Sequence, residues 1–151
     1  MLMPGIAQRH AFERPQLIRF SHCDPAGLVF FPQYLVMFNQ LVEDWFTEAL
    51  GLPYAEILGP RRTGLPTVSL TCDFIAPSRM GEILTLGLTL QRVGRASFSV
   101  DWGARCGDQA RVTARQVLVT TSLDTHRSIP IPEDMRRALL DRASPRDGDR
   151  T

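Results

Sequence analysis

Hydrophobic and polar residues repeat with two different periods along this chain, and each period predicts its own kind of element. From 32 to 50, large apolar residues recur at intervals of three and four positions, which predicts one long amphipathic helix. Gly51 follows directly, and glycine is the residue that most often ends a helix. The apolar stripe consists of Tyr34, Phe38, Leu41, Val42, Trp45 and Ala49. We expect this stripe to face the core.

Alternation of apolar and polar residues, with a period of two, predicts five β-strands. One strand is expected before the helix, at 16–21, and four more follow it, at 67–75, 82–93, 95–105 and 110–123. Shorter helical patterns lie at 54–58 and 133–142. Glycine and proline are concentrated in the segments between these elements, which are therefore expected to be turns and connections.

The order strand, long helix, four strands limits the possible architectures. One helix cannot cover both faces of a five-stranded sheet, so the sheet must curl around the helix or pair with another subunit. We predict an α+β protein in which a curved five-stranded antiparallel sheet wraps around one long central helix, the arrangement of the hotdog fold. Residues 16–143 are expected to form this single domain, 1–15 a flexible N-terminal arm and 144–151 a disordered tail.

Composition excludes several classes of partner. The chain has 151 residues, 44% hydrophobic and 22% charged, which is ordinary for one globular domain. Its net charge of +1 gives no general attraction to nucleic acid or to an anionic membrane surface. No apolar run approaches the ~20 residues needed to cross a bilayer, and no signal peptide is visible. Three widely spaced cysteines form neither a disulfide framework nor a metal-ligand pattern, which favours a cytoplasmic location.

The segment between the first strand and the long helix carries the most chemistry. Asp24 provides a carboxylate, and the Leu-Val-Phe-Phe run that starts at Leu28 provides an apolar wall that a solvated loop would avoid. Pro32 suits the first position of a helix, where free backbone N–H groups and the helix dipole stabilise negative charge. From spacing alone, however, a turn-forming or helix-capping role for Asp24 is favoured, since Asp-Pro commonly opens a turn.

The stretch Asp-Pro-Ala-Gly-Leu-Val-Phe-Phe-Pro-Gln-Tyr, 24–34, resembles the active-site motif of the 4-hydroxybenzoyl-CoA thioesterases, a family of hotdog-fold enzymes. A weaker likeness extends over 16–123. The resemblance implies that Asp24 is the catalytic carboxylate, acting as a nucleophile or as a general base on water. It also implies that the backbone N–H of Phe31 polarises the thioester carbonyl. Because Pro32 has no N–H, Phe31 and Gln33 are the natural donors.

The same resemblance implies further contacts with the substrate. Asn39 occupies a position where the family has a polar residue near the acyl pocket, and Thr67 and Ser69 begin the strand that faces the active site across a dimer interface. Arg95 matches a segment that carries basic residues near the nucleotide of coenzyme A, whose phosphates suit arginine. Within the motif itself, the implied substrate-binding residues are Gly27, Val29 and Tyr34. The alternative role is a helix-surface amide for Asn39, a solvated surface charge for Arg95, and ordinary strand alternation for Thr67 and Ser69.

We therefore predict a cytoplasmic acyl-CoA thioesterase that hydrolyses an aromatic or medium-sized acyl-CoA. No cofactor or metal is expected, since coenzyme A is part of the substrate. The resemblance implies a homodimer joined through the sheets and a dimer of dimers, a homotetramer. Two alternatives remain open: a thioesterase for acyl carrier protein, and a non-catalytic acyl-CoA-binding protein of the same fold.

Two other kinds of chemistry are disfavoured. A hotdog dehydratase needs a histidine near the helix, and none lies between His22 and His126. A cysteine nucleophile at Cys23 has no recognisable histidine partner, because neighbouring side chains in an extended segment, such as those of His22 and Cys23, point apart.

Overall fold

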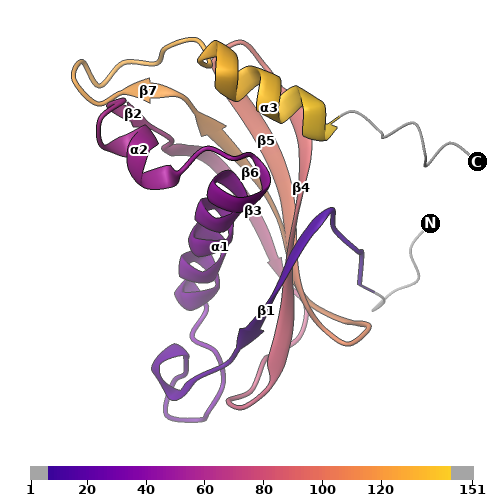
Figure 1. Ribbon diagram of the computed structural model, residues 1–151. Coiled ribbons are helices and arrows are strands. Elements are labelled where there is room, and N and C mark those ends of the chain that lie inside the picture. Colours follow the sequence, from indigo (N-terminus) through magenta and orange to yellow (C-terminus); the bar gives the residue numbers. More distant parts are fainter. Residues whose placement is uncertain (1–6, 144–151) are drawn as a thin grey trace, which may run out of the picture. The chain divides into compact units, whose positions relative to one another are not determined.

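The computed structural model describes residues 7–143 (Figure 1). In chain order, its elements are β1 (Phe12–Leu17), the 3₁₀ turn η1 (Phe20–His22), α1 (Pro32–Asp44), the π-helical turn η2 (Trp45–Ala49), α2 (Tyr54–Leu58), β2 (Thr63–Gly64), β3 (Thr67–Phe74), β4 (Ile83–Val93), β5 (Ser97–Cys106), β6 (Gln109–Val119), β7 (Thr121–Ser122) and α3 (Glu133–Ala143). Five strands form one sheet in the order β1-β4-β5-β6-β3, and β2 pairs with β7. The tail predicted at 144–151 and the start of the predicted arm lie outside the described residues. Within 7–143, no helix is both long and apolar enough to cross a membrane.

The long helix forms where its pattern predicts. It begins at Pro32, continues through the π-helical turn, and ends at Gly51, whose φ of 69° is the left-handed conformation expected of a terminating glycine. The short helix predicted at 54–58 is α2.

The first strand differs from the prediction. It was expected at 16–21, but β1 runs from Phe12 to Leu17, so that residues 12–15 of the predicted arm belong to the sheet. Its position is set by antiparallel pairing with β4, from Phe12 opposite Leu88 to Leu17 opposite Ile83. Local alternation contains no information about so distant a partner. Residues 20–22 turn instead, because the N–H of His22 donates to the carbonyl of Arg19 at 3.0 Å.

Two compact units make up the described chain. The first comprises 7–43, 71–89 and 101–115, and the second comprises 44–70, 90–100 and 116–143, so that β3, β4, β5 and β6 each contribute a part to both. In the first unit, Phe38 of α1 packs on Trp102 of β5 with ring centroids 3.4 Å apart. Its core also buries Ile18 and Leu84.

The second unit has its own apolar core. Trp45 and Phe46 of η2 pack on Phe98 of β5, with ring centroids 6.3 and 6.0 Å apart. Met135 and Leu139 of α3 are fully buried. Elsewhere in this unit, the guanidinium of Arg136 donates to the carbonyls of Gly94 and Arg95, which ties α3 to the β4–β5 turn.

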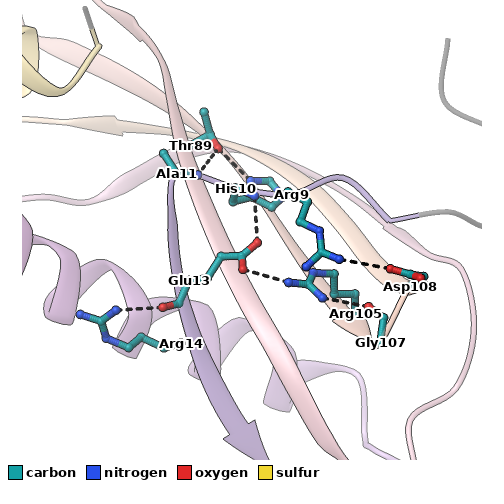
Figure 2. A network of polar contacts seen from close by, with 9 residues as sticks. All are labelled: Arg9, His10, Ala11, Glu13, Arg14, Thr89, Arg105, Gly107 and Asp108. Carbon is teal, nitrogen blue, oxygen red and sulfur yellow. Dashed lines mark hydrogen bonds and ion pairs between the residues drawn. The ribbon is translucent and has the colours of Figure 1, made fainter. Parts of the chain in front are cut away.

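A polar network joins the residues before β1 to the sheet (Figure 2). The backbone N–H of His10 donates to Glu13, which forms an ion pair with Arg105 at 2.9 Å. The His10 ring lies beside two glycines, Gly87 and Gly103, and Nδ1 of His10 lies 3.0 Å from the hydroxyl of Thr89. Burial of the ring lowers the pKa of His10 below its ordinary value, so the neutral imidazole is favoured.

The absence of a side chain at Gly87 makes room for His10, and this gives a testable expectation. A Cβ at position 87 would lie 2.6 Å from Cβ and Cδ2 of His10. Gly87→Ala should therefore lower the free energy of unfolding by about 1–3 kcal/mol, a typical cost of overpacking. Chemical denaturation measures this loss. The loss should be smaller in a His10→Gly background; an equal loss in both backgrounds would contradict the explanation.

Candidate active site

The loop that follows η1 is closed by the Asp24 carboxylate. Its Oδ1 accepts the backbone N–H of Ala26 at 2.9 Å and that of Leu28 at 3.2 Å. The backbone of Asp24 also donates to Leu28 and accepts from Gly27, whose φ is 77°. The turn-forming role that spacing favours is thus present. Within residues 7–143, Oδ2 accepts no hydrogen bond, so one carboxylate oxygen stays available for chemistry.

The backbone at the start of α1 leaves one donor. The N–H of Gln33 donates to the carbonyl of Phe30 at 2.8 Å, and that of Tyr34 donates to Phe31 at 3.2 Å. Pro32 has no N–H. In the part of the chain that the structure describes, the N–H of Phe31 has no acceptor, and of the two predicted donors it is the one that remains available for an oxyanion.

The loop is held against the segment between β3 and β4. Val29 donates its N–H to the carbonyl of Ser78 at 2.9 Å, and Met80 donates to the carbonyl of Gly27 at 3.0 Å. A β-bridge also joins Leu28 to Arg79. The conformation of the Asp24 loop therefore depends on that of 77–82.

A buried polar cluster contacts this loop, and the sequence patterns did not predict it. Ser78 is fully buried, and its Oγ accepts the hydroxyl of Tyr34 at 2.8 Å and an Arg111 N–H at 3.3 Å. Arg111 forms a two-bond ion pair with Glu82 at 2.8 and 2.9 Å, and also donates to the carbonyl of Pro77 at 2.9 Å. These bonds to the guanidinium lower the pKa of Glu82 to about 2.

No local signal marks this cluster in the sequence. Arg111 and Glu82 lie on different strands or turns, and each alone looks like an ordinary surface charge. Burial raises the pKa of the Tyr34 hydroxyl, which therefore acts as a neutral donor to Ser78.

Three exposed aromatic residues, Phe30, Phe31 and Phe74, contact one another near the start of α1. The rings of Phe30 and Phe31 contact edge to face at 5.5 Å, and Phe31 contacts Phe74 of β3 in the same way at 5.9 Å. All three side chains are exposed in the protomer. We call these three residues the aromatic cluster.

The neighbours of Asp24 do not form a thiol nucleophile. Burial and the adjacent Asp24 charge raise the pKa of the Cys23 thiol, and its Sγ lies 3.4 Å from the carbonyl of Arg19. The Nδ1 of His22 accepts the N–H of Arg19 at 2.9 Å, while burial lowers the pKa of this imidazole. The thiol is therefore protonated at neutral pH.

The other predicted residues are distributed over both units. The first unit brings Gly27, Val29 and Tyr34 together with Asp24 and Phe31, and Asn39 is exposed on α1. The predicted residues of the second unit are Thr67, Ser69 and Arg95.

In that second unit, all three side chains are exposed. The hydroxyl of Thr67 accepts Nε2 of Gln116 at 2.6 Å, and the carbonyl of Arg95 accepts the N–H of Ile131 at 2.9 Å.

Comparison with known proteins identifies the class to which this fold and loop belong. The family model of the thioesterase-like superfamily matches residues 18–139, and the chain belongs to that superfamily. The predicted family, the predicted hotdog α+β fold and the predicted class of enzyme, a thioester hydrolase, are thereby confirmed.

Individual relatives span most of the chain. A 1,4-dihydroxy-2-naphthoyl-CoA hydrolase from Synechocystis is 26% identical over 132 residues, covering 86% of this chain and 95% of the relative. A 4-hydroxybenzoyl-CoA thioesterase from Pseudomonas is 29% identical over 127 residues, covering 79% and 90%. The crystal structure of a 1,4-dihydroxy-2-naphthoyl-CoA thioesterase from Synechocystis superposes with a TM-score of 0.80 at 26% identity, covering 89% of this chain and 98% of the other.

Proposed function

We propose that this protein hydrolyses the thioester of an aromatic acyl-CoA to the free acid and coenzyme A. The observation that carries the proposal is the loop in which Asp24 keeps one oxygen free while the N–H of Phe31, at the start of α1, has no acceptor within the described chain. The relatives named for aromatic CoA thioesters support the substrate class.

The chemistry follows from these two groups. As a general base, Asp24 removes a proton from water, and the resulting hydroxide attacks the thioester carbon. As a nucleophile, it attacks that carbon itself; departure of the thiolate leaves a mixed anhydride, which water then hydrolyses to the free acid and the regenerated Asp24 carboxylate. On either route the carbonyl oxygen becomes an oxyanion, which the N–H of Phe31 and the positive end of the α1 dipole stabilise. The C–S bond then breaks, and the thiolate of coenzyme A leaves and takes up a proton.

The aromatic cluster supports an aromatic rather than a medium-sized aliphatic acyl group. Phe30, Phe31 and Phe74 are exposed, and their rings contact one another around Phe31, the residue that carries the proposed oxyanion donor. An aromatic acyl group placed there gains edge-to-face or offset contacts worth ~0.5–1.5 kcal/mol beyond simple burial. A flexible alkyl chain gains only the burial.

The remaining predicted contacts are proposals of the same kind. Asn39 would contribute a polar group near the acyl group, Thr67 and Ser69 would face the active site of a partner subunit across the dimer interface, and Arg95 would bind a phosphate of coenzyme A. The reaction requires no cofactor or metal, because water and the carboxylate provide its chemistry. We also keep the cytoplasmic location as a prediction.

The exposed edge of the sheet supports a homodimer. The strand β3 lies at one end of the sheet order, and two of its apolar side chains, Val68 and Phe74, are 61% and 50% exposed. Exposed edge strands pair readily with another strand. Pairing of two β3 strands would join two sheets, and a dimer of dimers would complete the proposed homotetramer.

Thiol release from a panel of acyl-CoAs tests the proposal. The panel contains benzoyl-, 4-hydroxybenzoyl- and phenylacetyl-CoA beside short and long aliphatic esters. Turnover concentrated on the aromatic esters is the expected result. Thiol release from acyl carrier protein thioesters but from no CoA ester would show a thioesterase for acyl carrier protein instead. Binding of acyl-CoA without turnover would show a non-catalytic acyl-CoA-binding protein.

Shortening one ring of the aromatic cluster should change the preference within this panel. Phe74→Ala removes the ring that contacts Phe31. We expect kcat/KM for the aromatic esters to fall about 10-fold relative to the aliphatic esters, equivalent to ~1.4 kcal/mol of lost contact. Ile75→Ala, which shortens another exposed apolar residue directly after β3, is the control. An equal fall for both ester classes would show that Phe74 has no part in selecting the acyl group.

A further inference from the structure

Ser78 connects three parts of the first unit that lie far apart in the sequence. Its carbonyl accepts the N–H of Val29 in the Asp24 loop. Its fully buried hydroxyl accepts the hydroxyl of Tyr34, in the first turn of α1. The same hydroxyl accepts an N–H of Arg111 from β6. One residue thus contacts both the loop that carries the carboxylate and the helical turn that follows the oxyanion donor.

Arg111 fixes the position of Ser78 and its neighbours through several hydrogen bonds. Nη1 of Arg111, which donates to Ser78, also donates to the carbonyl of Pro77, and the guanidinium is fixed by its two bonds to Glu82, one from Nη1 and one from Nη2. Glu82 in turn accepts the backbone N–H of Arg79 at 2.7 Å. The arginine side chain is 7% exposed. Both ends of segment 77–82, at Pro77 and Glu82, are therefore hydrogen-bonded to the buried guanidinium of Arg111.

We propose that Arg111 is a positioning residue for the thioesterase site, acting through Ser78 to fix the Asp24 carboxylate relative to the N–H of Phe31. The inference rests on the proposed function. Arg111 does not touch the substrate. It determines where Ser78 lies, and Ser78 determines where the Asp24 loop and the first turn of α1 lie with respect to each other.

The size of the expected effect follows from the demands of the reaction. A carboxylate and an oxyanion donor must be held within ~0.5 Å of their productive positions. A displacement of ~1 Å can cost ~10²-fold in rate even when no reacting group is removed. Directional hydrogen bonds to a buried hydroxyl and two carbonyls fix such positions more tightly than apolar packing does.

The chain contains a matched control for this arginine. Arg105 forms an ion pair with Glu13 in the same unit (Figure 2). The side chains of Arg105 and Glu13 are 11% and 26% exposed, against 7% and 26% for Arg111 and Glu82. Arg105 also donates to a backbone carbonyl, that of Gly107. It has no contact with Ser78 or the Asp24 loop among the interactions of residues 7–143. Removing either arginine leaves a carboxylate of equal exposure without its cation, but only the removal of Arg111 affects the site.

The experiment compares Arg111→Met with Arg105→Met in the full chain. Steady-state hydrolysis of the best aromatic ester in the panel is measured together with denaturant unfolding, so that rates are expressed per folded protein. Both variants should lose stability to a similar extent. We expect Arg111→Met to lower kcat by about 10–100-fold with KM changed less than about 3-fold, and Arg105→Met to keep both values near those of the wild type.

Ser78→Ala provides a second, milder variant if Arg111→Met does not fold. It removes the buried hydroxyl but keeps the carbonyl that Val29 uses, and should lower kcat about 10-fold with KM unchanged. Full kcat in the folded Arg111 and Ser78 variants, or an equal loss of kcat in Arg105→Met, would overturn the positioning role. If the wild type hydrolyses no ester, or if Asp24→Asn is fully active, the proposed function fails and the inference fails with it. Activity that is lost in Asp24→Asn but retained in Arg111→Met and Ser78→Ala overturns the inference alone.

Discussion

Asp24→Asn is expected to lower kcat by about 10²–10⁴-fold, the usual contribution of a general acid or base, while the protein stays folded. Asparagine keeps a side-chain oxygen at the position of Oδ1, so the two bonds from the N–H groups of Ala26 and Leu28 can remain. It cannot act as a base or as a carboxylate nucleophile. The turn-forming role and the chemical role of this residue are thereby separated in one variant.

Two further variants complete the Asp24 experiment. Asp24→Ala removes the turn-closing oxygen as well, and should combine the loss of kcat with reduced stability. Asp108→Asn changes an exposed turn carboxylate that pairs only with Arg9 among the described residues, and should leave kcat unchanged. Thiol-release kinetics and circular dichroism measure both properties. Wild-type kcat in Asp24→Asn would assign Asp24 to structure alone.

Arg111→Met is expected to lower the free energy of unfolding at pH 7 by about 3–5 kcal/mol. The substitution leaves the Glu82 carboxylate without its cation and also removes the donors to Pro77 and Ser78. Urea denaturation measures the loss. Arg9→Met, which breaks an exposed pair with Asp108, should change stability by less than about 1 kcal/mol. Similar small losses in both variants would mean that water reaches Glu82 freely.

The same ion pair should make the wild-type protein sensitive to acid. The pKa of Glu82 is about 2 in the folded protein, against an ordinary value of 4.5. Below pH 4.5 the unfolded chain takes up a proton that the folded protein does not, so stability falls as the pH drops from 4.5 toward 2. The contribution lost is on the order of 3 kcal/mol. Urea unfolding at pH 6 and pH 3 should show a smaller decrease in Arg111→Met than in the wild type.

Local sequence patterns predicted the elements whose formation depends on neighbouring residues. The apolar stripe of 32–50 and the turn residues around 54–58 locate α1, η2 and α2 correctly, because side-chain period and helix termini are local properties. The motif around Asp24 likewise pointed to the loop in which a carboxylate oxygen and the N–H of Phe31 are both free.

Features that depend on distant partners were not predictable in this way. The limits of β1 follow from its pairing with β4, and the cluster of Ser78 and Arg111 forms only when β6 meets the segment after β3. Alternation predicted a strand at 67–75, yet seven of the eight residues of β3 are exposed in the protomer and the eighth, Cys72, is half-buried, and β3 has a partner strand on one edge only. Alternation alone does not show whether a neighbouring strand is present.

The exposed edge at β3 also has consequences for handling the protein. A strand with an unpaired edge and exposed Val68, Leu70 and Phe74 is a template for irregular strand addition, and Asp73 is its only charged residue. An isolated protomer is therefore prone to aggregate. A charged substitution at Val68 should improve the solubility of the monomer, but at the cost of any assembly that uses this edge.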